Sequence, residues 1–126
     1  MLQLNYRDAK PIYEQIKEGI RHLLLTNAIA ADEKLPSVRE LASNLAINPN
    51  TIQRAYKELE TEGYVYSMKG KGTFASATDF IHKSREQELL MTFDDIVTEL
   101  LVLKVSKEEL GCRLENLNQG RLEKND

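Results

Sequence analysis

The sequence predicts an α+β, mostly helical fold: an N-terminal winged helix-turn-helix followed by a small two-helix C-terminal dimerisation domain. Three observations predict it. Residues 11–62 carry three successive helical apolar stripes, two short β-prone runs separated by glycines follow, and the remaining residues return to a helical pattern. We expect residues 1–76 to form the winged domain and residues 77–126 to form a helical dimerisation or effector tail.

The first predicted helix covers residues 11–27. Pro11 suits a first helical turn, and Asn27 can adopt the left-handed conformation that ends a helix. Apolar residues recur at helical spacing between them, at Ile12, Ile16, Ile20, Leu23 and Leu24. Before this helix, residues 2–6 alternate weakly in polarity, so we expect a short strand there.

The second helix begins at a capping box, in which Ser37 and Glu40 satisfy each other's free backbone N–H groups. Its apolar stripe consists of Val38, Leu41, Ala42 and Leu45. A tight turn over residues 46–48 leads to the third helix, for which Asn48 is the N-cap and Pro49 the first residue. The apolar stripe of the third helix consists of Ile52, Ala55, Tyr56 and Leu59, and Gly63 ends it.

Residues 64–68 and 72–76 read as the strands of a hairpin, joined by the lysine- and glycine-bearing loop Lys69–Gly72. A long helix over residues 79–103 follows, capped by Thr78 or Asp79. Its apolar seam, assigned to dimerisation, contains Leu89, Phe93, Ile96, Val97, Leu100 and Leu103. A second capping box at Ser106–Glu109 predicts a last short helix, and residues 118–126 read as a frayed tail.

Composition excludes several classes of function. The net charge is −3, yet residues 1–76 hold ten lysines and arginines against nine acids, while residues 77–126 hold seven against eleven. The acidity therefore belongs mainly to the tail, away from a candidate binding surface. One cysteine and two distant histidines predict no disulfide, metal site or cofactor. Neither a signal peptide nor a membrane span is expected, so we expect a cytoplasmic protein without a membrane partner.

The third helix presents a polar face that suits nucleic acid. On a helical wheel, Asn50, Gln53, Arg54 and Lys57 lie opposite the apolar stripe, and each can donate hydrogen bonds to bases or phosphates. The same face would also suit a helix that only meets solvent. Its place, second in a helix-turn-helix and before a hairpin with Lys69 and Lys71, favours double-stranded DNA.

The stretch LPSVRELASNLAINPNTIQRAYKELETEGYVYSMKGKGTFA, at residues 35–75, resembles the DNA-binding domain of the GntR family of bacterial transcription regulators. The similarity extends back to PIYEQIKEGI, and the short tail is similar to that of the YtrA subfamily. The resemblance implies a homodimeric repressor or regulator, with the third helix in a major groove and the hairpin near the minor groove.

Matching residue by residue, the resemblance assigns DNA contact to Arg39, to Asn50, Thr51 and Gln53 at the tip of the third helix, and to Gly70 and Lys71 at the tip of the hairpin. Many relatives outside this subfamily carry arginines where this chain has Pro49 and Gln53, so base contacts at those two positions do not transfer. Pro49 has no N–H to donate.

Two alternatives stay open. A winged helix can also serve as a protein–protein adaptor without specific DNA readout, and the net charge suits that role. An enzyme is not expected, because the sequence shows no nucleophile–base–acid set and no phosphate-cradling loop. A small-molecule effector is conceivable, and with so small a tail it would have to bind between subunits or between winged domain and tail.

Overall fold

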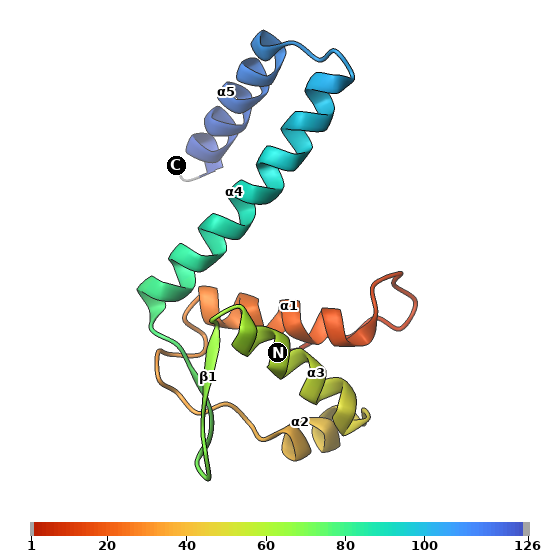
Figure 1. Ribbon diagram of the computed structural model, residues 1–126, viewed down its shortest axis with the longest axis vertical. Coiled ribbons are helices and arrows are strands. Elements are labelled where there is room, and N and C mark those ends of the chain that lie inside the picture. Colours follow the sequence, from red (N-terminus) through yellow and green to blue (C-terminus); the bar gives the residue numbers. More distant parts are fainter. Residues whose placement is uncertain (1, 125–126) are drawn as a thin grey trace. The chain divides into compact units, whose positions relative to one another are not determined.

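The computed structural model describes the backbone of residues 2–124 and the side chains of residues 2–121 (Figure 1). The chain divides into two compact units, Met1–Glu86 and Gln87–Asp126. Five helices and one hairpin are described, and the predicted fold class is confirmed. Their bounds are α1 (Ile12–Leu25), α2 (Val38–Leu45), α3 (Pro49–Thr61), β1 (Val65–Met68), β2 (Gly72–Ala75), α4 (Thr78–Val102) and α5 (Lys107–Lys124).

The predicted strand at residues 2–6 is wrong. The segment pairs with no described strand, and the side chain of Gln15 takes hydrogen bonds of its backbone instead. The backbone N–H of Asn5 donates to Gln15 Oε1, and Gln15 Nε2 donates to the Asn5 carbonyl, both at 2.8 Å. The weak alternation is explained instead by Leu2 and Leu4, which pack against the core.

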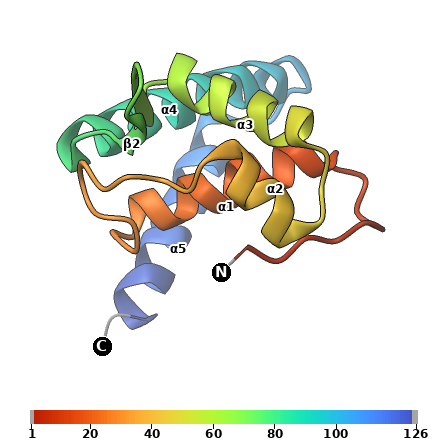
Figure 2. The ribbon, with the colours of Figure 1, turned by 90° about the horizontal axis from the view of Figure 1, so that it is seen from below.

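The core of the N-terminal unit lies between α1, α2 and α3 (Figure 2). The third helix α3 packs on both α1 and α2, and the predicted apolar stripe of α3 is completely buried. The buried residues are Ile16, Ile20, Leu24, Leu35, Ala42, Ile52, Ala55, Tyr56, Leu59, Tyr64, Val65, Ala75 and Ile81. Because the buried side of α3 is fixed in this way, its opposite side is held at the surface of the unit.

All three of these helices end in the same way, with a residue of positive φ just after the last turn. These residues are Asn27, Ala46 and Gly63, with φ of 61°, 54° and 87°. After α3, the N–H of Gly63 donates to the Glu60 carbonyl and that of Tyr64 to the Leu59 carbonyl. This is the Schellman arrangement, which satisfies carbonyls that the helix leaves free.

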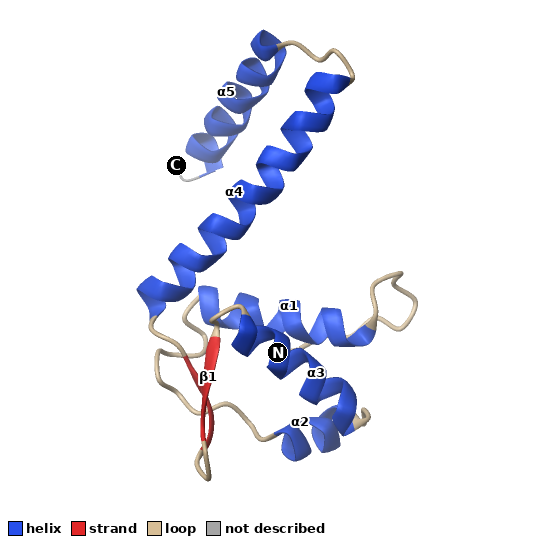
Figure 3. Cartoon of the chain, in the orientation of Figure 1, coloured by secondary structure: helices blue, strands red, loops and turns tan. Residues whose placement is uncertain are grey.

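The wing is the antiparallel hairpin of β1 and β2, with Tyr66 opposite Phe74 and Met68 opposite Gly72 (Figure 3). The loop before α2 runs along β2 as a third strand-like segment. In it, the Leu35 N–H donates to the Thr73 carbonyl and the Ala75 N–H donates to the Glu33 carbonyl, both at 2.8 Å. The wing is therefore tied to the start of α2 and does not hang free.

The first two turns of α4 belong to the N-terminal unit. Ile81 is buried in its core, and Ser84 Oγ donates to the carbonyl of Glu62, just past the end of α3, at 3.0 Å. Nε2 of His82 lies 3.1 Å from the carbonyl oxygen of Leu25, the last residue of α1. The unit thus extends to Glu86, beyond the boundary that we expected after residue 76.

The C-terminal unit contains the rest of α4 and α5, which turns back beside α4 (Figure 1). Lys104, with φ of 69°, ends α4, and Ser106 Oγ accepts from the Glu109 N–H at the start of α5, as the second capping box predicts. The predictions of a last short helix and of a frayed tail from residue 118 are wrong, because α5 continues to Lys124. The final two residues lie outside the described part. Within that part, no helix is both long and apolar enough to span a membrane.

Candidate nucleic-acid interface

The exposed start of α3 is set by its cap. Asn48 Oδ1 accepts from the Asn50 N–H at 2.9 Å, and Pro49, as the first helical residue, has no N–H to satisfy. The backbone N–H of Asn50 is therefore already bonded. The exposed side-chain amide of Asn50 is the group left to contact a partner. Thr51 is half-buried beside it.

A polar hollow of about 330 Å³ separates α3 from the wing. Gln53 and Lys57 line it from the helix, and Ser67 and Thr73 line it from the strands. Glu60 of α3 also lines the hollow and accepts a hydrogen bond from Ser67 Oγ. This bond fixes the wing relative to α3 and leaves Gln53 and Lys57 exposed on the same side as the wing.

Arg54 lies on the other flank of α3, facing α1. Its guanidinium carbon is 3.6 Å from the ring centroid of Tyr13, and its Nε donates to Glu58 Oε2 at 3.3 Å. The structure therefore does not bring Arg54 together with Gln53, Lys57 and the wing. The helical wheel could not separate Arg54 from them, because the wheel does not include the neighbouring helix.

Beside Arg54, Lys17 joins α1 to the last turn of α3 by ion pairs with Glu58, at 3.2 Å, and Glu62. Burial lowers the pKa of Lys17, but the hydrogen bonds that Lys17 donates to Glu62 and Glu58 outweigh it and the net shift is upward. The same hydrogen bond from Lys17 lowers the pKa of Glu58. This flank is thus neutralised internally, and its charges serve packing between helices.

The other predicted cations contrast with that flank. Arg39, Lys57, Lys69 and Lys71 are exposed, and in the described residues none of them forms an ion pair. They come from α2, α3 and the wing. Gly70, between the two wing lysines, has φ of 77° and open space around it, which suits close approach to a partner.

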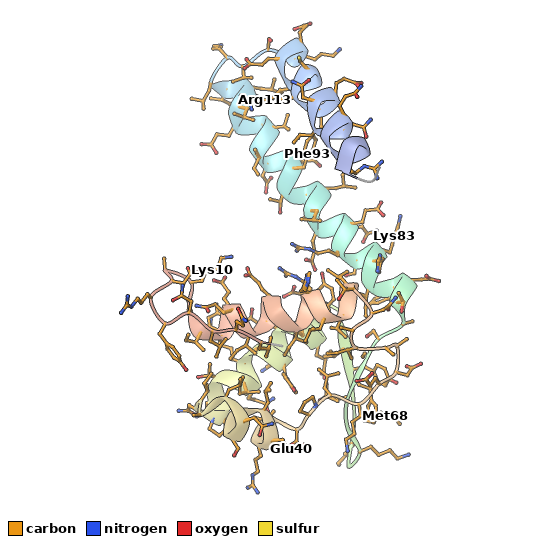
Figure 4. The ribbon with its side chains drawn as sticks, turned by 180° about the vertical axis from the view of Figure 1, so that it is seen from behind. Lys10, Glu40, Met68, Lys83, Phe93 and Arg113 are labelled. Atoms are coloured by element: carbon orange, nitrogen blue, oxygen red, sulfur yellow. The ribbon has the colours of Figure 1, made fainter. Side chains whose placement is uncertain are left out.

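The start of α2 and the tip of the wing lie at the same end of the N-terminal unit, where Figure 4 labels Glu40 and Met68. Glu40 does not form an ion pair within the described residues, and it contributes to a raised pKa at Tyr56. Burial is the larger cause of that shift and takes the pKa of Tyr56 to about 12. The Tyr56 hydroxyl donates to the Pro36 carbonyl at 2.7 Å, so this side chain ties α3 to the start of α2 and is not exposed for stacking.

One cation on this surface escaped the sequence reasoning. Lys34 precedes α2 in sequence, yet it pairs with Phe74 of the wing. A polar loop before Leu35 gives no signal of such pairing. Only its positive charge, directly before the Leu35-Pro36-Ser37 start of α2, could have marked Lys34 as a candidate contact.

The residues predicted for dimerisation lie along the second half of α4, except Leu103, which follows directly after the helix. Within a single chain, Leu89, Phe93, Ile96 and Leu103 remain 50%, 44%, 54% and 67% exposed, and Val97 and Leu100 are half-buried. On α5, Leu114 and Leu117 are also exposed. Figure 4 shows side chains projecting from both helices, with Phe93 and Arg113 labelled.

Comparison with known proteins places this geometry in a family. Residues 12–75 match the bacterial regulatory proteins of the gntR family. The HTH-type transcriptional repressor YtrA of Bacillus subtilis is 40% identical over 94% of this chain and 88% of its own length. The uncharacterised regulator YhcF of the same organism is 34% identical over 91% of this chain and 96% of its own.

Solved structures agree. A GntR family transcriptional regulator from Listeria monocytogenes is 34% identical and matches 88% of this chain and 98% of its own with a TM-score of 0.68. The DNA-binding domain of AraR, solved in complex with operator ORR3, is 32% identical and matches 59% of this chain and 89% of its own with a TM-score of 0.53. The family is one of transcription regulators and not of enzymes. The chain therefore belongs to the GntR family of bacterial regulatory proteins and resembles its YtrA group along nearly its whole length.

Proposed function

We propose that this chain is a dimeric, sequence-specific DNA-binding transcription regulator that acts as a repressor at an inverted-repeat operator. The observation that carries the proposal is the group of exposed cations without ion pairs on α2, α3 and the wing. Cations left unpaired on one surface are suited to phosphates, whose neutralisation supplies much of the affinity for DNA. The operator complexes of the AraR domain and the repressor role of YtrA support it.

In the proposed complex, the start of α3 enters the major groove and the wing lies at the minor groove. Asn50, Thr51 and Gln53 contact base edges, since amide groups pair well with the donor and acceptor of adenine. Arg39, Lys57, Lys69 and Lys71 contact phosphates, and Gly70 allows the tip of the wing to approach the groove. Arg54 holds α3 against α1 through Tyr13 and Glu58, so we assign it a supporting role.

The dimer is proposed from the apolar side chains of the C-terminal unit. Leu89, Phe93 and Ile96 form an apolar row on α4 that one chain leaves exposed, and Leu103, just after the helix, is exposed as well. Rows of this kind are rarely left in water. A second copy offers the same row, so a two-fold axis would bury both together. Such an axis would present the winged domains of the two chains to the two halves of a palindromic operator.

DNA binding is tested by titrating the protein against a duplex from the region upstream of its own gene, at several salt concentrations. We expect affinity to fall steeply with salt, and Lys71→Ala to weaken binding to every sequence because it removes a phosphate contact. Gln53→Ala should instead relax the preference for one base, at a cost of ~1–3 kcal/mol on the preferred site.

Lys83→Ala is the matched control, because Lys83 lies on α4 in an ion pair with Glu86, at the other end of the N-terminal unit from the labelled Glu40 and Met68 (Figure 4). Its loss should leave affinity unchanged. Absence of DNA binding by the unmodified protein at low salt would contradict the proposal and favour a protein–protein adaptor.

Dimerisation is tested by Phe93→Asp, which places a charge in the apolar row. We expect this variant to sediment as a monomer where the unmodified protein sediments as a dimer, and to bind an inverted repeat only as tightly as a single half. Thr98→Glu is the control, since a step of 100° per residue places Thr98 on the opposite side of α4. If Phe93→Asp dimerised as well as Thr98→Glu does, this row would be ruled out as the interface.

A further inference from the structure

The wing has two faces, and the proposed DNA contacts account for one of them and for the tip. Ser67 and Thr73 point to the inner face, where they line the hollow beside α3. Tyr66 and Phe74 alternate with them and therefore point to the outer face. Their rings stack there with centroids 5.6 Å apart. Nothing assigned so far gives the outer face a role.

Lys34 lies on this outer face. It forms an antiparallel bridge with Phe74, and residues directly opposite each other in such a pair project to the same side. The backbone on either side is fixed to β2, through Leu35 to Thr73 and through Glu33 to Ala75. The position of Lys34 is therefore set by the sheet, although the residue belongs to the loop between α1 and α2.

The side chain of Lys34 extends toward the tip of the wing. A Cβ atom placed on Gly72 would lie 2.9 Å from Lys34 Cε and 3.7 Å from its Nζ. The space that Gly72 leaves empty is thus the path of the lysine, and its ammonium group lies beside the residue that follows Lys71. Any other residue at position 72 would have to displace this lysine.

The charge of Lys34 is not neutralised by the described residues around it. Lys34 is exposed and forms no ion pair there. Both neighbouring acids have other partners: Asp32 accepts from the Tyr66 hydroxyl at 2.8 Å, and Glu33 accepts from the Ala30 N–H at 3.1 Å. Like Lys69 and Lys71, Lys34 is therefore an exposed cation without an ion pair in the described residues.

From these observations we propose that Lys34 is a further phosphate-contacting residue and gives the wing a cation on its outer face. A minor groove is bordered by the phosphates of two strands, so a hairpin at the groove faces one strand with each side. Lys57 and the inner face then meet one backbone, Lys69 and Lys71 lie at the groove, and Lys34 meets the other backbone. This inference rests on the proposed DNA-binding function and adds a residue that the family resemblance did not assign.

The test compares Lys34→Gln with the unmodified full-length protein, using a duplex from upstream of the gene and a duplex of arbitrary sequence. Each phosphate contact contributes about 0.9 to the slope of log affinity against log salt. We expect Lys34→Gln to reduce that slope by about 1 and to weaken binding at low salt on both duplexes. The double variant Lys34→Gln/Lys71→Gln should reduce the slope by about 2, and Lys34→Arg should restore it.

Lys83→Gln removes the same charge from α4 and should leave the slope unchanged, which excludes a general effect of net charge. Thermal melting of Lys34→Gln should match that of the unmodified protein, because the bonds that fix this segment are made by the backbone. An unchanged slope in Lys34→Gln would overturn the inference while leaving the proposed function intact. Failure of the unmodified protein to bind either duplex would instead overturn the proposed function itself.

Discussion

At Ala46 the backbone adopts a left-handed conformation, with φ of 54°, between the two helices of the helix-turn-helix. The Ile47 N–H donates to the Ala42 carbonyl across this residue, so the turn from α2 to α3 depends on it. An L-residue with a Cβ pays ~1–2 kcal/mol in this conformation, whereas glycine adopts it freely. The turn that sets the angle between α2 and α3 is therefore strained.

Replacement of Ala46 by glycine should stabilise the protein. Glycine relieves the strain but loses more entropy on folding, so we expect a net gain of up to about 1 kcal/mol in the free energy of unfolding. Ala28→Gly is the control, since Ala28 is exposed and its φ is not positive. Denaturant titration of both variants measures the difference, and a loss of stability in Ala46→Gly would contradict the account.

Tyr56 predicts a loss of stability at high pH. Burial and the charge of Glu40 raise its pKa from 10.0 to about 12, so folding favours the neutral phenol. The resulting stabilisation is complete below pH 10 and is lost as the pH rises toward 12. Fully lost, it amounts to about 3 kcal/mol, since the shift is about two pKa units and one unit corresponds to about 1.4 kcal/mol.

Tyr56→Phe removes this titration together with the hydrogen bond to Pro36. We expect it to destabilise the protein by ~0.5–1.5 kcal/mol near neutral pH, because the Pro36 carbonyl loses its donor. The gap between variant and unmodified protein should narrow as the pH rises past 10, as urea titrations at a series of pH values would reveal. A gap that stays constant up to pH 12 would count against a raised pKa.

At the scale of single residues, sequence reasoning succeeded where the chemistry is local. The Asn48 cap, Pro49 at the first helical position and the end of α3 at Gly63 all depend on neighbours in sequence, and all three are confirmed. The roles of Arg54 and Lys34 depend on Tyr13 and Phe74, which lie far away in sequence. A helical wheel or a loop composition carries no information about such partners.

At the scale of elements, whether a glycine stabilises the fold depends on its place in a helix. Gly63 ends α3 with φ of 87°, and a Cβ there would lie 2.5 Å from Phe80 Cε1 on α4. Gly111 lies inside α5 with no atom within 4 Å of the corresponding position. The same substitution should therefore have opposite effects at the two sites.

We expect Gly63→Ala to lower the free energy of unfolding by more than ~1 kcal/mol, through strained backbone and displacement of Phe80. Gly111→Ala should raise it by roughly 0.5–1 kcal/mol, because alanine in a helix interior loses less entropy than glycine. Thermal denaturation of the two variants in parallel tests the pair. A stabilising Gly63→Ala would show that neither the φ angle nor the contact with Phe80 constrains this site.

The elements themselves were largely predictable, since every helix and both strands follow a hydrophobic period with recognisable ends. The two errors have physical causes. Residues 2–6 alternate like a strand, but a strand needs a partner, and Gln15 supplies hydrogen bonds in its place. The length of α5 was underestimated because its apolar pattern stops after Leu117, while the polar residues that follow continue the helix.

At the scale of the whole molecule, the boundary of the N-terminal unit lies within a helix. The gntR family match ends at residue 75 and the domain that we expected ends at residue 76, but the compact unit continues to Glu86. The added turns supply Ile81 to the core, where it is only 2% exposed. Hydrophobic pattern alone marks the start of a helix but not which of its turns pack on the preceding domain.

A fragment of residues 1–86 should consequently fold on its own, whereas a fragment of residues 1–76 should be much less stable. Loss of one buried isoleucine side chain typically costs ~2–5 kcal/mol, before the hydrogen bonds of His82 and Ser84 are considered. Chemical denaturation of both fragments measures the difference. Equal stability of the two fragments would mean that α4 contributes nothing to the winged domain.

The contacts of Ser84 and His82 with Glu62 and Leu25 also bear on how such regulators can be recombined. A chimaera that joins this N-terminal unit to a foreign C-terminal domain must keep the native sequence through Glu86. With a junction at the end of the hairpin, the following helix would lack Ser84 and His82. The carbonyls of Glu62 and Leu25, at the ends of α3 and α1, would then lose these hydrogen bonds. The first turns of α4 thus belong functionally to the N-terminal unit and should be transferred with it.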